Sequence, residues 1–214
     1  MIAAAIVAVR LNSADRIVMS GLGGGLHKPE DGVRLNNMVS SLSLAGGVEE
    51  PTLVVLSDDA RNAMAVRARS RNHLVVTQGL LANLEVVELE GLVAELLARL
   101  RNGDAEAATV GAALFGVPLL DGPVAPLLGP LARVGLGRLL RDDRDLTADR
   151  EAVSLTRYPP GLHGALRTIA AGSHRPAADR AGLSHLWLVD PRAGGDQADS
   201  RASLDLRIDI LAEL

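Results

Sequence analysis

Apolar residues recur at helical spacing along much of the chain. In residues 32–45 they line one face and two glycines follow, a pattern that predicts a helix ending at the glycines. A wider stripe in residues 86–101 predicts a buried helix, with Gly103 in capping position. The stripes consist of Leu35, Met38, Val39 and Leu42 in the first helix and of Leu89, Leu92, Val93, Leu96 and Leu100 in the second.

Other stretches predict strands and further helices. Residues 52–56 and 73–77 are apolar and rich in β-branched side chains, as strands are, and residues 62–67 are compatible with a shorter third strand. Helices are expected over residues 143–155, 160–171 and 202–214, the last with Leu204, Ile208 and Leu211 on its apolar face. Residues 175–182 and 191–200 are loops by composition. The chain is therefore expected to be an α+β protein, mostly helical with a small β-sheet.

The first residues of the chain are apolar but too few to span a membrane. The run in residues 1–9 ends at Arg10, short of the roughly 20 residues that a spanning helix needs. It also lacks the basic start of a signal peptide. A glycine-rich stretch at residues 21–25 follows. We therefore interpret residues 1–29 as an apolar segment with a linker, and residues 30–214 as a single domain.

Residues 107–132 form a second apolar stretch, in which Asp121 is the only charged residue. Gly122 and four prolines break it into two short arms, and neither arm is long enough to cross a bilayer. We expect it to fold back as a hairpin insertion against the domain, a partner protein or a membrane surface, because an exposed apolar area of this size favours aggregation.

Composition excludes several kinds of partner and chemistry. The net charge is −4, so the chain has no basic field to attract nucleic acid. One Trp, one Tyr and one Phe leave little aromatic surface for stacking on bases or flavins, and the absence of cysteine excludes disulfides, thiolate metal sites and a cysteine nucleophile. We expect no cofactor and no nucleic-acid partner.

Candidate catalytic groups are few. His27, His73, His163, His174 and His185 fit no metal-ligand spacing. The acidic clusters at residues 58–59 and 141–145 are typical of turns and helix starts. Residues 21–25 lack the preceding strand and the Lys-Ser/Thr of a phosphate loop, and no serine stands in a Gly-x-Ser-x-Gly elbow. We expect no catalytic residue and no metal ligand.

Short segments spread over residues 31–214 resemble one family when they are taken in order. They are Asn62-Ala63-Met64, residues 76–81 (Val-Thr-Gln-Gly-Leu-Leu), residues 89–94 and 101–104, residues 148–153, Gly161-Leu162 with Ala165-Leu166, residues 186–191, and Arg207-Ile208 with Leu211. Together they are similar to the HtpX and CAAX-prenyl-protease type of zinc metallopeptidase. The resemblance implies a zincin-like fold in which residues 86–101 correspond to the helix that carries the family's HExxH motif.

The resemblance also implies that the zinc site is lost. A zincin needs two histidines one helical turn apart and a glutamate beside the first. Alignment on Asn102 and Asp104 places Glu95 and Arg99 at the ligand positions and Leu96 at the general base. A register shifted by one residue restores Glu95 as the base but makes Ala94 and Ala98 the ligands. The third ligand falls on Thr147.

The replacements suggest a new interaction at the same place. Glu95 and Arg99 are an acidic and a basic residue at i, i+4, which favours an ion pair on a helix. We expect Asp149 to be able to join this pair if it is buried in the former cleft; an ordinary exposed pair is the alternative.

Two function classes follow from the resemblance. The first is an inactive pseudopeptidase that binds, scaffolds or regulates a protein complex or a homo-oligomer, with Ala63, Met64, Ala65 and Val66 as a peptide-binding edge strand. The second is a hydrolase with a rebuilt, non-zinc active site in the same cleft. In the first case we expect a cytoplasmic protein, peripheral at a membrane complex through residues 107–132.

Overall fold

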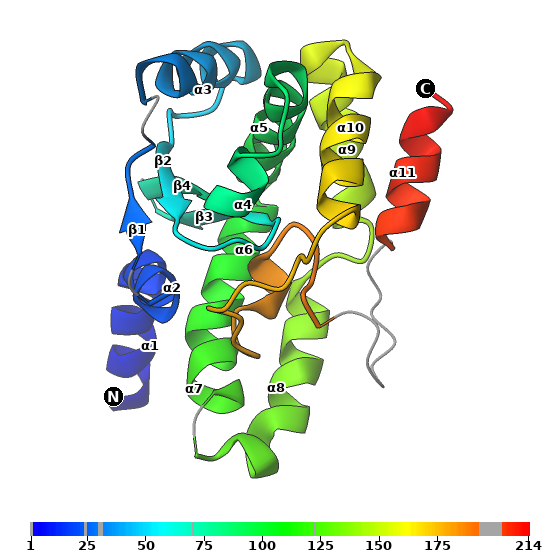
Figure 1. Ribbon diagram of the computed structural model, residues 1–214. Coiled ribbons are helices and arrows are strands. Elements are labelled where there is room, and N and C mark those ends of the chain that lie inside the picture. Colours follow the sequence, from blue (N-terminus) through cyan, green and yellow to red (C-terminus); the bar gives the residue numbers. More distant parts are fainter. Residues whose placement is uncertain (1, 24, 30–31, 70, 122, 193–202) are drawn as a thin grey trace.

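The computed structural model describes residues 2–23, 25–29, 32–69, 71–121, 123–192 and 203–214, without the side chains of residues 2–6 and 32. A small sheet lies near the centre, with helices on both of its faces (Figure 1). The protein is mostly helical, and the expected α+β class is confirmed.

The sheet has four strands in the order β1-β2-β4-β3. β2 (Thr52–Leu56) and β4 (Arg71–Thr77) run parallel, with Thr52 opposite His73. β3 (Ala63–Ala68) and β4 form an antiparallel hairpin, while β1 (Leu26–His27) pairs antiparallel with β2. The three predicted strands are confirmed, and β1 was not predicted because a two-residue strand carries too few side chains to show alternation.

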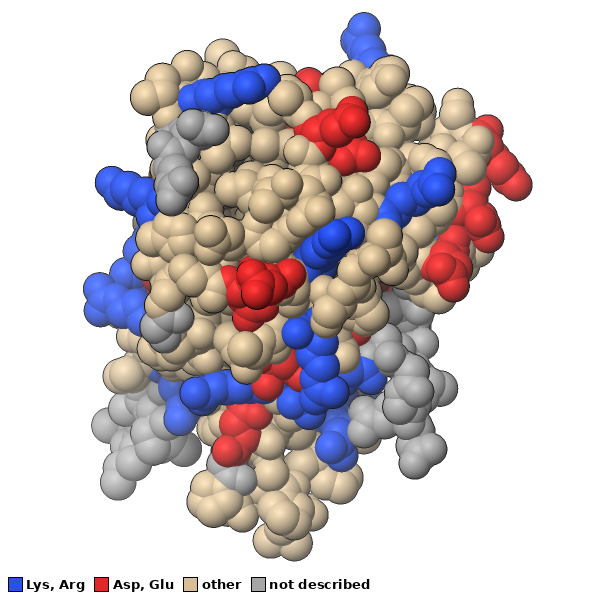
Figure 2. Space-filling view, in the orientation of Figure 1, with Lys and Arg blue, Asp and Glu red and all other residues tan. Residues whose placement is uncertain are grey.

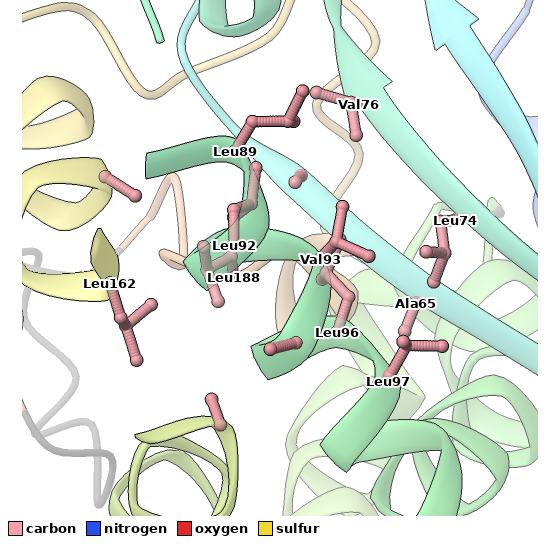
Figure 3. Packing of buried hydrophobic residues seen from close by; sticks show 14 of the residues in the cluster. Ala65, Leu74, Val76, Leu89, Leu92, Val93, Leu96, Leu97, Leu162 and Leu188 are labelled. Carbon is pink, nitrogen blue, oxygen red and sulfur yellow. The ribbon is translucent and has the colours of Figure 1, made fainter. Parts of the chain in front are cut away.

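Helix α5 (Val86–Arg101) occupies the centre of the main core and has the predicted bounds. Figure 3 shows its leucines and valines between the sheet residues Ala65, Leu74 and Val76 on one side and Leu162 on the other, all of which belong to one buried cluster. Around α5 lie α3 (Gly32–Gly46), α9 (Arg144–Thr156), α10 (Pro159–Ala170) and α11 (Leu204–Ala212). All four lie within two residues of the predicted bounds. Residues 193–200 of the predicted loop 191–200 lie outside the described residues.

α5 is buried on nearly all sides because α10 crosses it so closely that the backbones of the two helices approach each other. A Cβ atom added at Gly91 would collide with the backbone of Gly161 and Leu162. The same holds for Gly161, where a Cβ would meet the carbonyl oxygen of Val87. Glycine at the crossing lets the two helices approach this closely, and the remaining residues of α5 then pack against α9 and the sheet.

The opposite face of the sheet is covered by segments from both ends of the chain. α2 (Ala14–Gly21) brings Val18 to a second core, together with Met64 and Val66 of β3 and the fully buried Trp187. α1 (Ile2–Asn12), α6 (Asp104–Gly111) and the 3-10 turn η2 (Ser184–Leu186) lie nearby. Residues 14–22 thus contribute to the core and residues 26–27 to the sheet, whereas the sequence suggested a segment and linker apart from the domain. Ala14, Val18 and Leu22 recur every four residues, and this short stripe is what buries α2.

Residues 104–121 and 123–139 form a helical hairpin. α6 continues through a π-helical turn, η1 (Ala112–Gly116), into α7 (Val117–Leu120), and the chain returns as α8 (Ala125–Leu139). The arms are longer than the sequence suggested, because the first arm continues past Pro118 after the π-helical turn, Pro126 stands at the start of α8, and Pro130 is accommodated inside α8. Figure 2 shows an uncharged surface at this end of the molecule, with charged side chains gathered above it. Within the described residues, no helix combines the length and apolarity that crossing a membrane requires.

Candidate functional site

Glu95 and Arg99 lie on the side of α5 that faces α9, one helical turn apart. Their side chains are buried, with exposed fractions of 0% and 4%. The guanidinium of Arg99 donates from Nε to Oε1 of Glu95 at 2.7 Å and from Nη2 to Oδ1 of Asp145 at 2.7 Å. Asp145 stands in the first turn of α9 and is itself buried. A single positive group therefore lies between two carboxylates from two helices.

A second arginine enters the same cluster from α11. Arg207 is 1% exposed and donates from Nε and Nη2 to the two carboxylate oxygens of Asp149, at 2.8 and 2.7 Å. Its Nη2 also lies 3.2 Å from Oε1 of Glu95, and Nη1 donates to the carbonyl oxygen of Leu188. These contacts join Asp145, Arg99, Glu95, Arg207 and Asp149 into one buried chain of ion pairs, which we call the ionic network.

The ionic network has one more carboxylate than guanidinium groups, and it lies in a low-dielectric interior. Burial raises the pKa of Glu95 above its ordinary value, and the positive charges of Arg99 and Arg207 oppose that rise. The carboxylates hold the pKa of both arginines above the ordinary value, so both stay charged. Oε2 of Glu95 is buried and accepts no hydrogen bond from the part of the chain that the structure describes. Burial thus opposes the charge of Glu95, and one of its carboxylate oxygens has no hydrogen-bond donor among the described residues.

The structure brings three of the sequence-predicted site residues together and separates two. Glu95, Arg99 and Asp149 are members of the ionic network. Leu96 is fully buried in the apolar core, and Figure 3 shows it next to Val93 and Leu97. Thr147 lies outside the network, and its hydroxyl donates to the exposed carboxylate of Asp143.

Asp145, rather than Thr147, is the α9 residue whose carboxylate reaches Arg99. Thr147 stands two residues further along α9, and two residues turn a side chain to a different face of a helix. The spacing of buried residues gives the reason: Asp145, Ala148, Asp149 and Ala152 share the inward face of α9 at i, i+3, i+4 and i+7. Arg207 was also missed as a site residue, although it stands on the stripe formed by Leu204, Ile208 and Leu211. A charge on an apolar stripe is a usable signal, because burial requires a partner for it.

The remaining candidates do not come together. His185 is buried, with Nε2 near the carbonyl oxygen of Ala108, and burial lowers the pKa of His73 beside Asp15. Asp58 accepts hydrogen bonds from the backbone of Ala60 and Ala177, as a turn residue does. Within the described residues, no three His, Cys, Asp or Glu side chains form a group that could hold a metal ion.

A zinc ion, which the family resemblance implies, does not fit the residues of the network. A guanidinium carries no lone pair for a metal and keeps its charge at any ordinary pH. Arg99 also places that charge between Glu95 and Asp145, where a cation would have to sit. The donor set is therefore that of an ion-pair network and not that of a metal centre.

β3 stands at the edge of the sheet, as expected for a peptide-binding strand, but its outer edge is covered. Met64 pairs in an isolated bridge with Trp187, and the backbone N–H of Leu188 donates to the carbonyl oxygen of Ala63 at 2.7 Å. Ala63, Met64, Ala65 and Val66 are all buried. Peptide binding at this strand stays a prediction, and it would require residues 186–189 to move.

Comparison with known proteins identifies the proteins to which this chain is similar. No family model matches the chain. Proteins named protease HtpX homolog match over most of it: that of Dictyoglomus thermophilum is 29% identical over 213 residues, covering 86% of this chain and 69% of the relative. The chain is a distant homologue of the HtpX proteases.

Two further HtpX homologues support the relationship. The one from Dictyoglomus turgidum is 30% identical over 199 residues, or 78% of this chain and 64% of the relative. The one from Salinibacter ruber is 28% identical over 218 residues, or 91% of this chain and 79% of the relative. The chain thus spans about two thirds to four fifths of the length of these HtpX relatives.

Proposed function

We propose that the protein is a catalytically inactive relative of the HtpX proteases that acts by binding a protein partner. The observation that carries the proposal is the position of Arg99, whose guanidinium lies between the carboxylates of Glu95 and Asp145. In a zinc peptidase of this type the corresponding space holds the metal that activates water. Here it holds a side chain that can neither ligate a metal nor take up a proton.

The position of a general base is also unsuited to catalysis. Leu96 follows Glu95 where the zincin motif has its glutamate, and it is packed into the apolar core with no exposed surface. A general base must lie within hydrogen-bond reach of the water that it deprotonates. Neither Leu96 nor the arginine-bound carboxylates can serve in this role.

A protein that keeps the fold without the chemistry retains surfaces for binding. We propose a protein partner or a second copy of the chain, with the covered β3 edge and the helical hairpin as the candidate contact regions. The hairpin exposes Leu127, Leu131 and Val134 on α8, and such a patch is typical of an interaction surface. We propose a cytoplasmic protein that is peripheral at a membrane complex through this hairpin.

Metal content tests the proposal directly. Protein purified without chelators should contain far less than one molar equivalent of zinc, and added zinc should not raise its unfolding midpoint. An intact HtpX homologue prepared in parallel serves as the positive control for metal retention. Stoichiometric, tightly bound zinc in this chain would overturn the proposal.

Assays of peptidase activity and of partner capture distinguish a binding protein from a hydrolase with a rebuilt active site. The protein should leave unfolded casein and a peptide library intact, and an affinity-tagged copy should retain a defined partner from extracts of its host. Leu127→Asp should reduce this capture if α8 forms the contact. Hydrolysis that persists in EDTA and is lost in a variant of a buried network residue would favour the alternative, a hydrolase with a non-zinc site.

A further inference from the structure

A pocket that shares no residue with the ionic network lies between α3, the turn formed by α4 (Gln78–Leu81) and the first turn of α5. It encloses about 310 Å³, which is at the lower end of the range for small-molecule sites. Its lining includes residues from both β1 and β2, next to the edge of the sheet. The pocket is therefore built by the fold itself and not by a single loop.

The walls of this pocket are apolar. Leu35, Val55 and Leu89 are buried at 8%, 2% and 7% exposure, and they belong to three different elements. Met38, Leu81 and Leu84 are partly buried and complete the lining with flexible aliphatic surface. Such walls favour an alkyl chain, because burial of apolar surface stabilises the complex by about 25 cal/mol per Å² before the costs of association.

The polar groups in the lining include a guanidinium and an imidazole. Arg34 lines the pocket, is exposed, and forms no ion pair with any residue in the described ranges. It stands in the first turn of α3, where a cation is opposed by the helix dipole, so helix stability does not explain it. His27 also lines the pocket. Its Nδ1 lies near Ser57 Oγ and Gly25 O, which leaves Nε2 to meet a ligand.

We infer that this pocket binds a small aliphatic carboxylate, a medium-chain fatty acid, with its alkyl chain against the leucines and its carboxylate on Arg34. Gln78 supplies a further hydrogen-bond donor in the lining. A guanidinium that forms no ion pair within the described residues, beside a mostly apolar pocket, complements both parts of such a ligand. This inference does not depend on whether the protein is an active peptidase.

Titration calorimetry with sodium decanoate below its micelle concentration tests the inference. Decanoate should bind one site, while decanol, which lacks the charge, and acetate, which lacks the chain, should bind at least about tenfold more weakly. The same loss is expected for decanoate with Arg34→Gln. Arg150→Gln is the matched control, because Arg150 is also an exposed helical arginine that forms no ion pair with the residues that the structure describes, and it should leave binding unchanged.

A second variant locates the ligand within the pocket. Ala82→Trp places a large side chain at an exposed position of the lining, so it should block decanoate binding without lowering the unfolding midpoint. Absence of decanoate binding to the unchanged protein would overturn the inference. So would binding that survives both Arg34→Gln and Ala82→Trp, since decanoate would then occupy another apolar surface such as α8.

Discussion

Arg99 is the residue that most clearly distinguishes the network from a metal centre. Its planar guanidinium meets carboxylates from α5 and α9 and stays charged when buried. Removal of one partner of a buried ion pair typically destabilises a protein by about 3–5 kcal/mol, because the other charge is left unpaired. Arg99 therefore has a structural role that a neutral side chain cannot fill.

We predict that the single substitution Arg99→His creates a metal site. The imidazole would lie beside Glu95 and Asp145, which gives three ligands and one open position. Without metal the variant should be less stable than the unchanged protein, and zinc should raise its unfolding midpoint. Arg99→Met removes the same charge without adding a ligand, so its midpoint should not respond to zinc. Equal midpoints of Arg99→His in zinc and in EDTA would contradict the prediction.

Glu95 should make the free energy of unfolding depend on pH. Because burial raises its pKa, the folded state holds a proton that the unfolded chain has released. Stability is then largest below the ordinary glutamate pKa and falls as pH rises through the raised value. Glu95→Gln removes this titration. The urea midpoint of the variant, relative to that of the unchanged protein, should therefore increase as pH rises from about 4 to about 8.

The lowered pKa of His73 acts in the opposite direction, since its contribution is lost as pH falls. His73 is present in both the Glu95→Gln variant and the unchanged protein, so its contribution cancels in the difference between their urea midpoints. Parallel pH curves for Glu95→Gln and the unchanged chain would show that Glu95 is ionised at the same pH in the folded and unfolded states.

The sequence predicted the Glu95–Arg99 pair because i, i+4 spacing is a local property of a helix. It did not predict Asp145 as the second partner of Arg99, since the two residues lie 46 positions apart and their contact depends on the packing of α9 on α5. Arg207 is 112 positions from Glu95. The burial of the pair, which the sequence left open, follows from these distant partners.

At the scale of elements, α5 and the central strands were predictable because their apolar patterns extend over whole elements. Short elements such as β1 and α4 lack enough residues to show a period. The π-helical turn η1 was not predictable either, because it arises where the helix from Asp104 must fit against its neighbours and continue past Pro118. Tertiary packing decides such local irregularities.

The crossing of α5 and α10 gives a prediction at this scale. Gly91→Ala should lower stability by about 1–3 kcal/mol, because its Cβ would collide with the backbone of Gly161 and Leu162 and force the helices apart. Gly137→Ala in α8 is the control, since a Cβ there meets no atom within 4 Å. It should be neutral or stabilise the chain by up to about 1 kcal/mol. Thermal unfolding of both variants checks the pair, and similar effects would contradict the proposed close packing.

For the whole molecule, the helical hairpin carries several exposed apolar side chains. Leu127 and Leu131 of α8 are 80% and 74% exposed, far more than core leucines. The sequence indicated an apolar hairpin, because a run interrupted by glycine and prolines cannot form one long helix. It could not show which side of α8 faces outward, since that depends on contacts with η1 and α7.

We predict that Leu127→Asp combined with Leu131→Asp weakens attachment to the partner or membrane without lowering the unfolding midpoint. Cell fractionation should show the unchanged protein released from membranes by carbonate or salt, and the double variant free without either treatment. Leu44→Asp on α3 is the control, because Leu44 is 85% exposed and lies on another helix. Release by detergent alone, in the absence of a partner, would contradict peripheral attachment.

The guanidinium at the centre of the ionic network has a consequence for how the protein is made in a cell. A metal centre must be loaded after synthesis, and it can be emptied by a chelator or by a cell that is short of zinc. Arg99 is part of the polypeptide itself, as are its carboxylate partners Glu95 and Asp145. The central positive charge of this fold is therefore present in every copy of the chain, independent of metal supply.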